Sequence, residues 1–170
     1  MQFDLLIRGG DIIDGAGREP ARSADVGVTG GRIVAVGTLD GSTAETVVDA
    51  AGKVVCPGFV DVHVHSEVAL LGGPYRYGAL LQGVTTQLLA PDGFGWAPLP
   101  PEPARQLWEY TLFAYGAGDL ELGWPTAERY LALFEGNTPA NVVPQVPHCA
   151  IRMRRWAGTP ARRPGTSWRA

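Results

Sequence analysis

The sequence has few cysteines, and no part of it is a long apolar run. Its two cysteines, Cys56 and Cys149, lie far apart, and neither belongs to a Cys-x-x-Cys pair. This usage argues against a disulfide scaffold and for a reducing compartment. No apolar stretch approaches the roughly 20 residues that a bilayer crossing needs, and residues 1–10 lack the basic region and apolar core of a secretory signal. We therefore expect a cytoplasmic protein without a membrane partner.

Acidic residues are absent from the last part of the chain. All 17 lie at or before Glu135, whereas 6 of the 14 basic residues follow it. Residues 154–170 consist mainly of Arg, Pro, Gly and Ala without periodicity, so we expect a basic tail that is disordered or out of frame. A basic tail can bind nucleic acid, but this is the weaker interpretation and we do not expect that partner. No Gly-x-Gly-x-x-Gly or Walker motif follows a predicted strand, which disfavours a nucleotide-binding domain.

The 170 residues, 45% hydrophobic and 18% charged, fit a soluble globular protein with one domain, or a small domain and part of another. Residues 1–56 read as short strands separated by glycine turns. Gly9-Gly10 separates two such strands, and Gly30-Gly31 predicts a hairpin. After Pro57-Gly58, predicted strands at 59–65, 84–89 and 141–151 alternate with predicted helices at 75–82, at 104–115 and from Thr126. This alternation is typical of a parallel α/β sheet or barrel.

The first of these later strands carries three titratable side chains. Asp61, His63 and His65 alternate with valines, so they share one face of a strand. Strands of a parallel sheet are usually apolar on both faces, and exceptions to this rule are expected at functional sites. Two imidazoles can bind one Zn²⁺ ion, which lowers the pKa of bound water to about 7, and Asp61 could orient a ligand histidine. The alternative is chance placement, but two of only three histidines lie two positions apart.

Three motifs together resemble a known family. They are Pro-Gly-Phe-Val-Asp-Val-His-Val-His at 57–65, Gly-Val-Thr-Thr at 83–86 and His-x-x-x-Arg at 148–152. The sequence resembles the metal-dependent amidohydrolase superfamily, and within it the N-acyl-D-amino-acid deacylase (D-aminoacylase) branch, over roughly residues 3–153. The resemblance implies an α/β fold with an incomplete (β/α)₈ TIM-type barrel, preceded by an N-terminal piece of a small β-sandwich. Residues 1–56 would supply the sandwich strands and 57–153 the first barrel strands and helices.

The resemblance also implies site residues. His63 and His65 would bind the metal, most simply zinc. Asp92 stands where the deacylases place a metal-binding cysteine, so it is a candidate ligand; the alternative is a turn aspartate before a glycine. His148, at the end of the predicted third strand, and Arg152 would lie near the metal or on the substrate side, although His148 could equally be a hydrogen-bonded structural residue.

The implied activity is metal-dependent hydrolysis of non-peptide C–N bonds in a small-molecule N-acyl amino acid or related amide. The family takes further histidines and a general-base aspartate from later strands, and a full barrel needs about 250 residues. This sequence has no histidine after His148 and no acid after Glu135. We therefore expect a truncated, inactive piece with no complete catalytic set. The alternative is a non-catalytic fragment or scaffold that retains part of a metal site.

Overall fold

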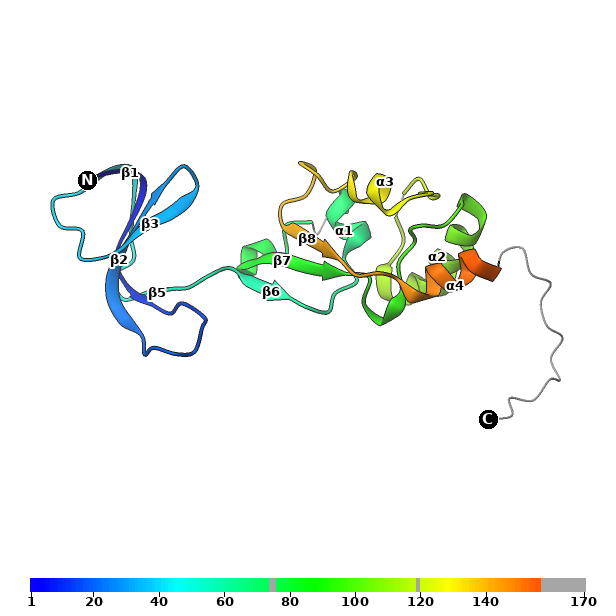
Figure 1. The fold of residues 1–170 in the computed structure, drawn as a ribbon, viewed down its shortest axis with the longest axis horizontal. Coiled ribbons are helices and arrows are strands. Elements are labelled where there is room, and N and C mark those ends of the chain that lie inside the picture. The colour runs from blue at the N-terminus through cyan, green and yellow to red at the C-terminus, as the bar shows by residue number, and fades with distance from the viewer. Residues whose placement is uncertain (74–75, 119, 157–170) are drawn as a thin grey trace. The chain divides into compact units, whose positions relative to one another are not determined.

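The computed structural model of the protein describes residues 1–73, 76–118 and 120–156. The chain divides into two compact units, Met1–Pro57 and Gly58–Ala170, and Figure 1 shows their strands and helices. Most of the basic tail expected from the sequence, residues 157–170, lies outside the described residues.

The first unit is a five-stranded sheet in the order β3-β2-β1-β4, in which β5 also pairs with β1 (Figure 1). Strands β1, β2 and β3 are antiparallel neighbours, whereas β4 and β5 run parallel to β1. The unit is thus formed entirely of strands, which are β1 (Gln2–Ile12), β2 (Arg22–Thr29), β3 (Arg32–Gly37), β4 (Thr43–Asp49) and β5 (Val54–Val55).

Two pairs of glycines behave differently in this sheet. Gly30 and Gly31, with φ of 57° and 70°, connect β2 to β3, so the predicted hairpin is confirmed; two left-handed positions suit its tight turn. The predicted break at Gly9-Gly10 is wrong, because β1 continues through both residues. The register instead shifts between Ile7 and Gly10, and Gly9 has φ of 67°, which is the geometry of a β-bulge.

The second unit is built on a parallel sheet in the order β6-β7-β8. Helices connect its strands, as the alternating sequence pattern predicts (Figure 1). Thr126 caps α3, because its hydroxyl accepts a hydrogen bond from the Arg129 amide at 3.2 Å, and this predicted helix start is confirmed. The elements are β6 (Phe59–Asp61), α1 (Glu67–Gly72), the 3₁₀ turn η1 (Leu80–Gln82), β7 (Val84–Leu89), the 3₁₀ turn η2 (Pro91–Gly93), α2 (Pro101–Tyr115), α3 (Ala127–Leu131), β8 (Asn141–Pro144) and α4 (His148–Trp156).

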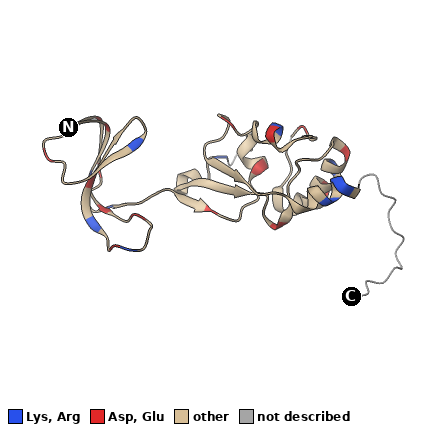
Figure 2. Ribbon diagram, in the orientation of Figure 1, with Lys and Arg blue, Asp and Glu red and all other residues tan. Residues whose placement is uncertain are grey.

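The chain after β8 differs from the sequence prediction. The strand expected to reach residue 151 ends at Pro144, and α4 begins at His148. Pro144 and Pro147 have no amide hydrogen for a strand ladder, so the extended pairing stops between them. Helix α4 includes residues 154–156, which were expected to lack structure, and its last turn is basic through Arg154 and Arg155 (Figure 2).

The structure also differs from the helix predicted over residues 75–82. Helix α1 lies earlier in the chain, and only η1 is helical within 76–82. Gly73 is extended, with φ of −68° and ψ of 156°, as expected for a residue before proline. Gly83 ends η1 in the left-handed region, with φ of 87°, so the predicted glycine stop is confirmed.

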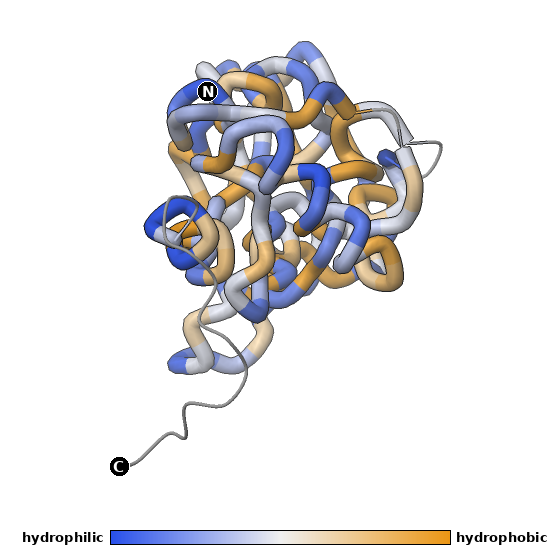
Figure 3. Tube along the Cα trace, turned by 90° about the vertical axis from the view of Figure 1, so that its right-hand side faces the viewer, coloured by the Kyte–Doolittle hydropathy of each residue, from blue (hydrophilic) through white to orange (hydrophobic). Residues whose placement is uncertain are grey.

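Hydrophobic and hydrophilic stretches are interspersed along the described part of the trace (Figure 3). Across the described ranges, none of the helices combines the length and the apolar character that a membrane crossing requires.

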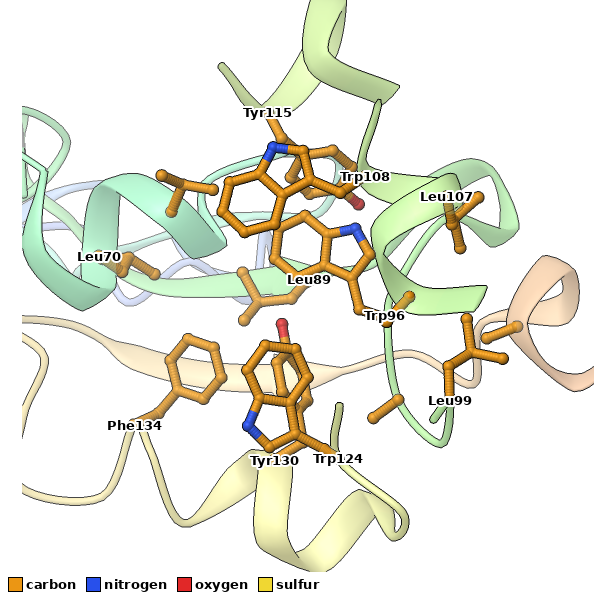
Figure 4. Packing of buried hydrophobic residues seen from close by; sticks show 14 residues of the cluster. Leu70, Leu89, Trp96, Leu99, Leu107, Trp108, Tyr115, Trp124, Tyr130 and Phe134 are labelled. Carbon is orange, nitrogen blue, oxygen red and sulfur yellow. The ribbon is translucent and has the colours of Figure 1, made fainter. Parts of the chain in front are cut away.

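An aromatic cluster forms the core of the second unit (Figure 4). Trp96 is fully buried, stacks on Trp108 with ring centroids 5.2 Å apart and lies 4.7 Å from the ring of Tyr115. This core fixes α2 and the segment after β7 against the sheet, and both carry residues of the site described below. Its buried members are Val68, Leu70, Leu89, Trp96, Ala97, Leu99, Ala104, Leu107, Trp108, Tyr115, Trp124, Tyr130, Phe134 and Ala150.

Candidate metal centre

The three predicted ligand residues follow two adjacent parallel strands. Strand β6 ends at Asp61, earlier than the predicted strand, so His63 and His65 lie in the segment immediately beyond it. Asp92 lies in η2, directly after β7. The carboxyl ends of parallel neighbours lie at the same edge of a sheet, where α/β proteins bind ligands. This topology is why residues almost 30 positions apart in the sequence meet.

The ligand atoms of His63, His65 and Asp92 all lie within 4.8 Å of one another. The Nε2 atoms of His63 and His65 lie 3.2 Å and 3.3 Å from the same oxygen, Oδ2 of Asp92. The two imidazole rings are nearly perpendicular, at 87°. The side chain of His63 is 62% exposed and that of His65 only 18%, so the group has one open side and one side against the protein.

This donor set fits a divalent metal ion. Imidazole nitrogen and carboxylate oxygen are ordinary zinc ligands, and catalytic zinc sites commonly use three protein ligands. Both Nε2 atoms already point at one carboxylate, and the buried Nδ1 of His65 has no partner among the described residues. In metal sites, the ring nitrogen of a histidine that does not bind the metal usually donates its N–H to a partner. For Nδ1 of His65, no described residue provides that partner.

Asp61 contacts the ligand segment through its backbone. Its Oδ1 accepts a hydrogen bond from the His63 amide at 3.1 Å. The carboxylate therefore fixes the backbone at the candidate ligand His63, and among the described residues it accepts no hydrogen bond from an imidazole. Local side-chain to backbone bonds of this kind are typical of aspartate after a strand.

The loop that carries Asp92 has an unusual backbone. Ala90 has φ of 58° and ψ of 43°, and Asp92 has φ of 59° and ψ of 11°. Aspartate tolerates the left-handed region, but for alanine it costs roughly 1–2 kcal/mol. Two buried side chains hold this loop. The Ala90 amide donates to Oε1 of Glu67 at 2.9 Å, and the Tyr115 hydroxyl donates to the Phe94 carbonyl at 3.1 Å.

Glu67 and Tyr115 are buried behind the ligands. Burial raises the pKa of Glu67 from 4.5 to about 7, although backbone N–H groups that include that of Ala90 oppose the change. Burial, together with the carboxylates of Glu67 and Asp92, raises the pKa of Tyr115 above its ordinary value. The phenol is therefore neutral at physiological pH and can donate its proton to Phe94.

Sequence reasoning did not single out Glu67 or Tyr115. The available signal for Glu67 was an acid two residues after His65, directly before the apolar run 68–71. Tyr115 is the last residue of the helix predicted at 104–115, and nothing else in the sequence marks it. Its ring in fact packs edge-on against His65, with centroids 4.8 Å apart.

His148 and Arg152 lie on α4, outside the group of three. His148 begins the helix and does not end a strand, which corrects its predicted placement. His148 is exposed and packs on the loop that carries Asp92. Its Cβ lies so close to Gly93 that a Cβ atom built on this glycine would be 3.2 Å from it. The guanidinium of Arg152 lies 4.2 Å from the ring centroid of Trp156.

The sequence is similar to curated deacylases, although no family model matches it. It is 46% identical to a D-aminoacylase of Alcaligenes xylosoxydans xylosoxydans over 105 residues, which are 59% of this chain and 22% of that protein. It is 36% identical to an N-acyl-D-aspartate deacylase of the same organism over 157 residues, which are 89% of this chain and 30% of that protein. The chain thus spans less than a third of the length of these relatives.

Solved structures give the same result. An N-acyl-D-glutamate deacylase from Bordetella bronchiseptica, complexed with zinc and a phosphonate inhibitor, superposes with a TM-score of 0.73 at 35% identity, covering 89% of this chain and 31% of that one. A D-aminoacylase described as defining a novel subset of amidohydrolases superposes with a TM-score of 0.70 at 36% identity, covering 88% and 31%. A further D-aminoacylase structure concerns a binuclear metal centre. Over the residues that it shares with these proteins, the chain belongs to the D-aminoacylase and N-acyl-D-amino-acid deacylase branch of the amidohydrolase superfamily.

Proposed function

We propose that this chain is the N-terminal portion of a metal-dependent hydrolase that cleaves the C–N bond of N-acyl amino acids or related small amides. The observation that carries the proposal is the convergence of His63, His65 and Asp92, whose ligand atoms lie within 4.8 Å. The relatives named above act on N-acyl-D-amino acids, and this supports the substrate class.

Zinc is the metal that this donor set favours. Two imidazole nitrogens and one carboxylate oxygen suit zinc better than magnesium or calcium, which prefer oxygen ligands alone. A bound metal supplies Lewis acidity toward an amide carbonyl. His63, His65 and Asp92 would hold such an ion; the side chain of His63 is the exposed one, where a small molecule can approach, while the more buried His65 packs against Tyr115.

Three further residues have proposed supporting roles. Asp61 fixes the backbone of the ligand segment through the His63 amide. His148 packs on the Asp92 loop at Gly93. Arg152 lies four residues further along α4, with its guanidinium over the Trp156 ring; the family resemblance alone supports a role for it on the substrate side.

The proposal includes the architecture. Residues 1–56 would be the N-terminal strands of a small β-sandwich, and residues 57–153 the first strands and helices of a (β/α)₈ barrel. The parallel order β6-β7-β8 supports the barrel assignment. So does the position of the ligands after the carboxyl ends of β6 and β7, because barrel enzymes place their sites at that end of their strands.

Metal analysis tests the ligand assignment. The protein is equilibrated with zinc, dialysed and analysed for bound metal by emission spectrometry. We expect bound zinc in the unchanged protein, its loss in the His63→Ala/His65→Ala variant, and its retention in Thr111→Val, which changes a buried side chain that bonds to carbonyls of its own helix. Equal metal content in the unchanged protein and the double variant would refute the proposed site.

Hydrolysis of N-acetyl-D-amino acids tests the activity separately. Metal-dependent turnover that disappears in the His63→Ala/His65→Ala variant would support hydrolysis by this chain itself. From this chain alone we expect metal binding without turnover, because the expected truncated piece lacks a complete catalytic set; the non-catalytic alternative predicts the same result, and turnover would refute both.

A further inference from the structure

The Asp92 loop, residues 90–94, is held at both ends by buried side chains that come from other elements. At its start, the Ala90 amide donates to Oε1 of Glu67 on α1 at 2.9 Å. At its end, the Phe94 carbonyl accepts from the hydroxyl of Tyr115 on α2 at 3.1 Å. Glu67 is completely buried and Tyr115 nearly so. Neither side chain is a member of the ligand group.

The conformation that these bonds maintain is one that the loop does not prefer. Ala90 is left-handed, and a non-glycine, non-Asx residue stays in that region only where its surroundings determine it. Asp92 follows two residues later, also left-handed, with its Oδ2 facing both imidazoles. A return of Ala90 to an ordinary conformation would redirect the chain immediately before the ligand and move that oxygen.

Tyr115 also contacts the histidine side of the group. Glu67 lies two residues after His65 in the chain, and the Tyr115 ring packs on the His65 ring at 4.8 Å. Tyr115 therefore links the loop that carries Asp92 to one imidazole, and Glu67 holds the other end of that loop.

We propose that Glu67 and Tyr115 are positioning residues that hold the Asp92 loop in its left-handed conformation and so preorganise the metal ligands. This inference rests on the proposed function for its metal. Residues that orient ligands without touching the metal typically change metal affinity 10- to 100-fold when they are removed, and the loop bonds act in the same way on Asp92.

Metal affinity of designed variants tests the proposal. Cobalt(II) is titrated into the full chain and followed by its visible absorption, which reports coordination directly. Glu67→Met removes the acceptor of the Ala90 amide at similar volume, and Tyr115→Phe removes only the hydroxyl. We expect about tenfold weaker binding or more for Glu67→Met, a smaller loss for Tyr115→Phe, and near-normal binding for Glu67→Gln, which keeps a carbonyl oxygen for Ala90. Thr111→Val is the matched control. Among the described residues, the buried Thr111 hydroxyl bonds only to carbonyls of its own helix, so the cobalt affinity of this variant should not change.

Amide hydrogen exchange of Ala90 in the metal-free protein provides a second measurement, which also serves if Glu67→Met binds no cobalt. Protection of this amide in the unchanged protein and in Glu67→Gln, and its loss in a folded Glu67→Met, is the expected pattern. Unchanged cobalt affinity in Glu67→Met, or an Ala90 amide that exchanges equally in both proteins, would overturn the positioning role. Failure of the proposed function looks different: the unchanged protein itself would bind no cobalt, or would bind it equally after His63→Ala/His65→Ala.

Discussion

The buried carboxyl of Glu67 makes stability depend on pH in a direction that can be calculated. Its pKa is about 7 in the folded protein and 4.5 at its ordinary value. Between these two pH values the unfolded chain has released the proton and the folded chain still holds it, so stability falls as pH rises. Below pH 4.5 both states are protonated and the penalty is absent; above pH 7 it is complete. At 1.36 kcal/mol per pKa unit, the full loss is about 3 kcal/mol.

Glu67→Gln removes this ionisation and keeps the acceptor for the Ala90 amide. At pH 4.5 we expect the free energy of unfolding of the variant to equal that of the unchanged protein or to lie slightly below it. At pH 7.5 we expect it to be higher by about 3 kcal/mol. Urea denaturation with a chelator present, followed by tryptophan fluorescence, measures the difference. The signal comes from the second unit alone, because residues 1–57 contain no tryptophan. Other titrating groups are common to both proteins and cancel. A difference that does not change with pH, or that favours the unchanged protein as pH rises, would refute the reasoning.

Three further predictions concern folding. Tyr130→Phe should stabilise the second unit by about 1 kcal/mol in urea denaturation, because the Tyr130 hydroxyl is buried without a partner among the described residues; a clear loss of stability would indicate a partner such as a buried water. Thr126→Ala should lower the stability of the second unit by about 1 kcal/mol, because it removes the oxygen that accepts a hydrogen bond from the Arg129 amide. Thr126→Ser should keep most of that stability. Equal stability of the two variants would contradict the role of Thr126 as a helix cap. Gly27→Ala should destabilise the first unit by about 1–3 kcal/mol, because the new Cβ would lie 2.6 Å from the Phe3 ring; faster exchange of β1 and β2 amides, relieved by Phe3→Leu, is the expected observation, and unchanged exchange would count against it.

The two candidate histidine ligands could be predicted from the sequence because their signal is local: His63 and His65 alternate with valines, so the strand period places them on one face. Asp92 was predicted from the family resemblance, and strand period alone does not single it out. The end of β6 was less predictable. Residues 62–65 have the same alternating pattern as a strand, but the pairing with β7 ends at Asp61, and the sequence does not show where that pairing stops.

The contacts behind the ligands could not be predicted in the same way. The bond between Glu67 and the Ala90 amide joins residues 23 positions apart, and it depends on a left-handed alanine that no propensity favours. The position of His148 was open to prediction, since Pro144 and Pro147 already disfavour a continuous strand. The two glycines of β1 show the opposite case, because only pairing with β2 reveals a bulge rather than a break.

The ligand group contains no sulfur. Two imidazoles and a carboxylate are not converted by the peroxide or air oxidation that takes thiolates to sulfenic and higher acids. The free cysteines of the chain, the exposed Cys56 and the partly buried Cys149, are not members of the group. Reductant can therefore be left out of metal titrations, where it would compete for the ion, and Cys56 can carry a fluorescent label while all three donors remain chemically intact.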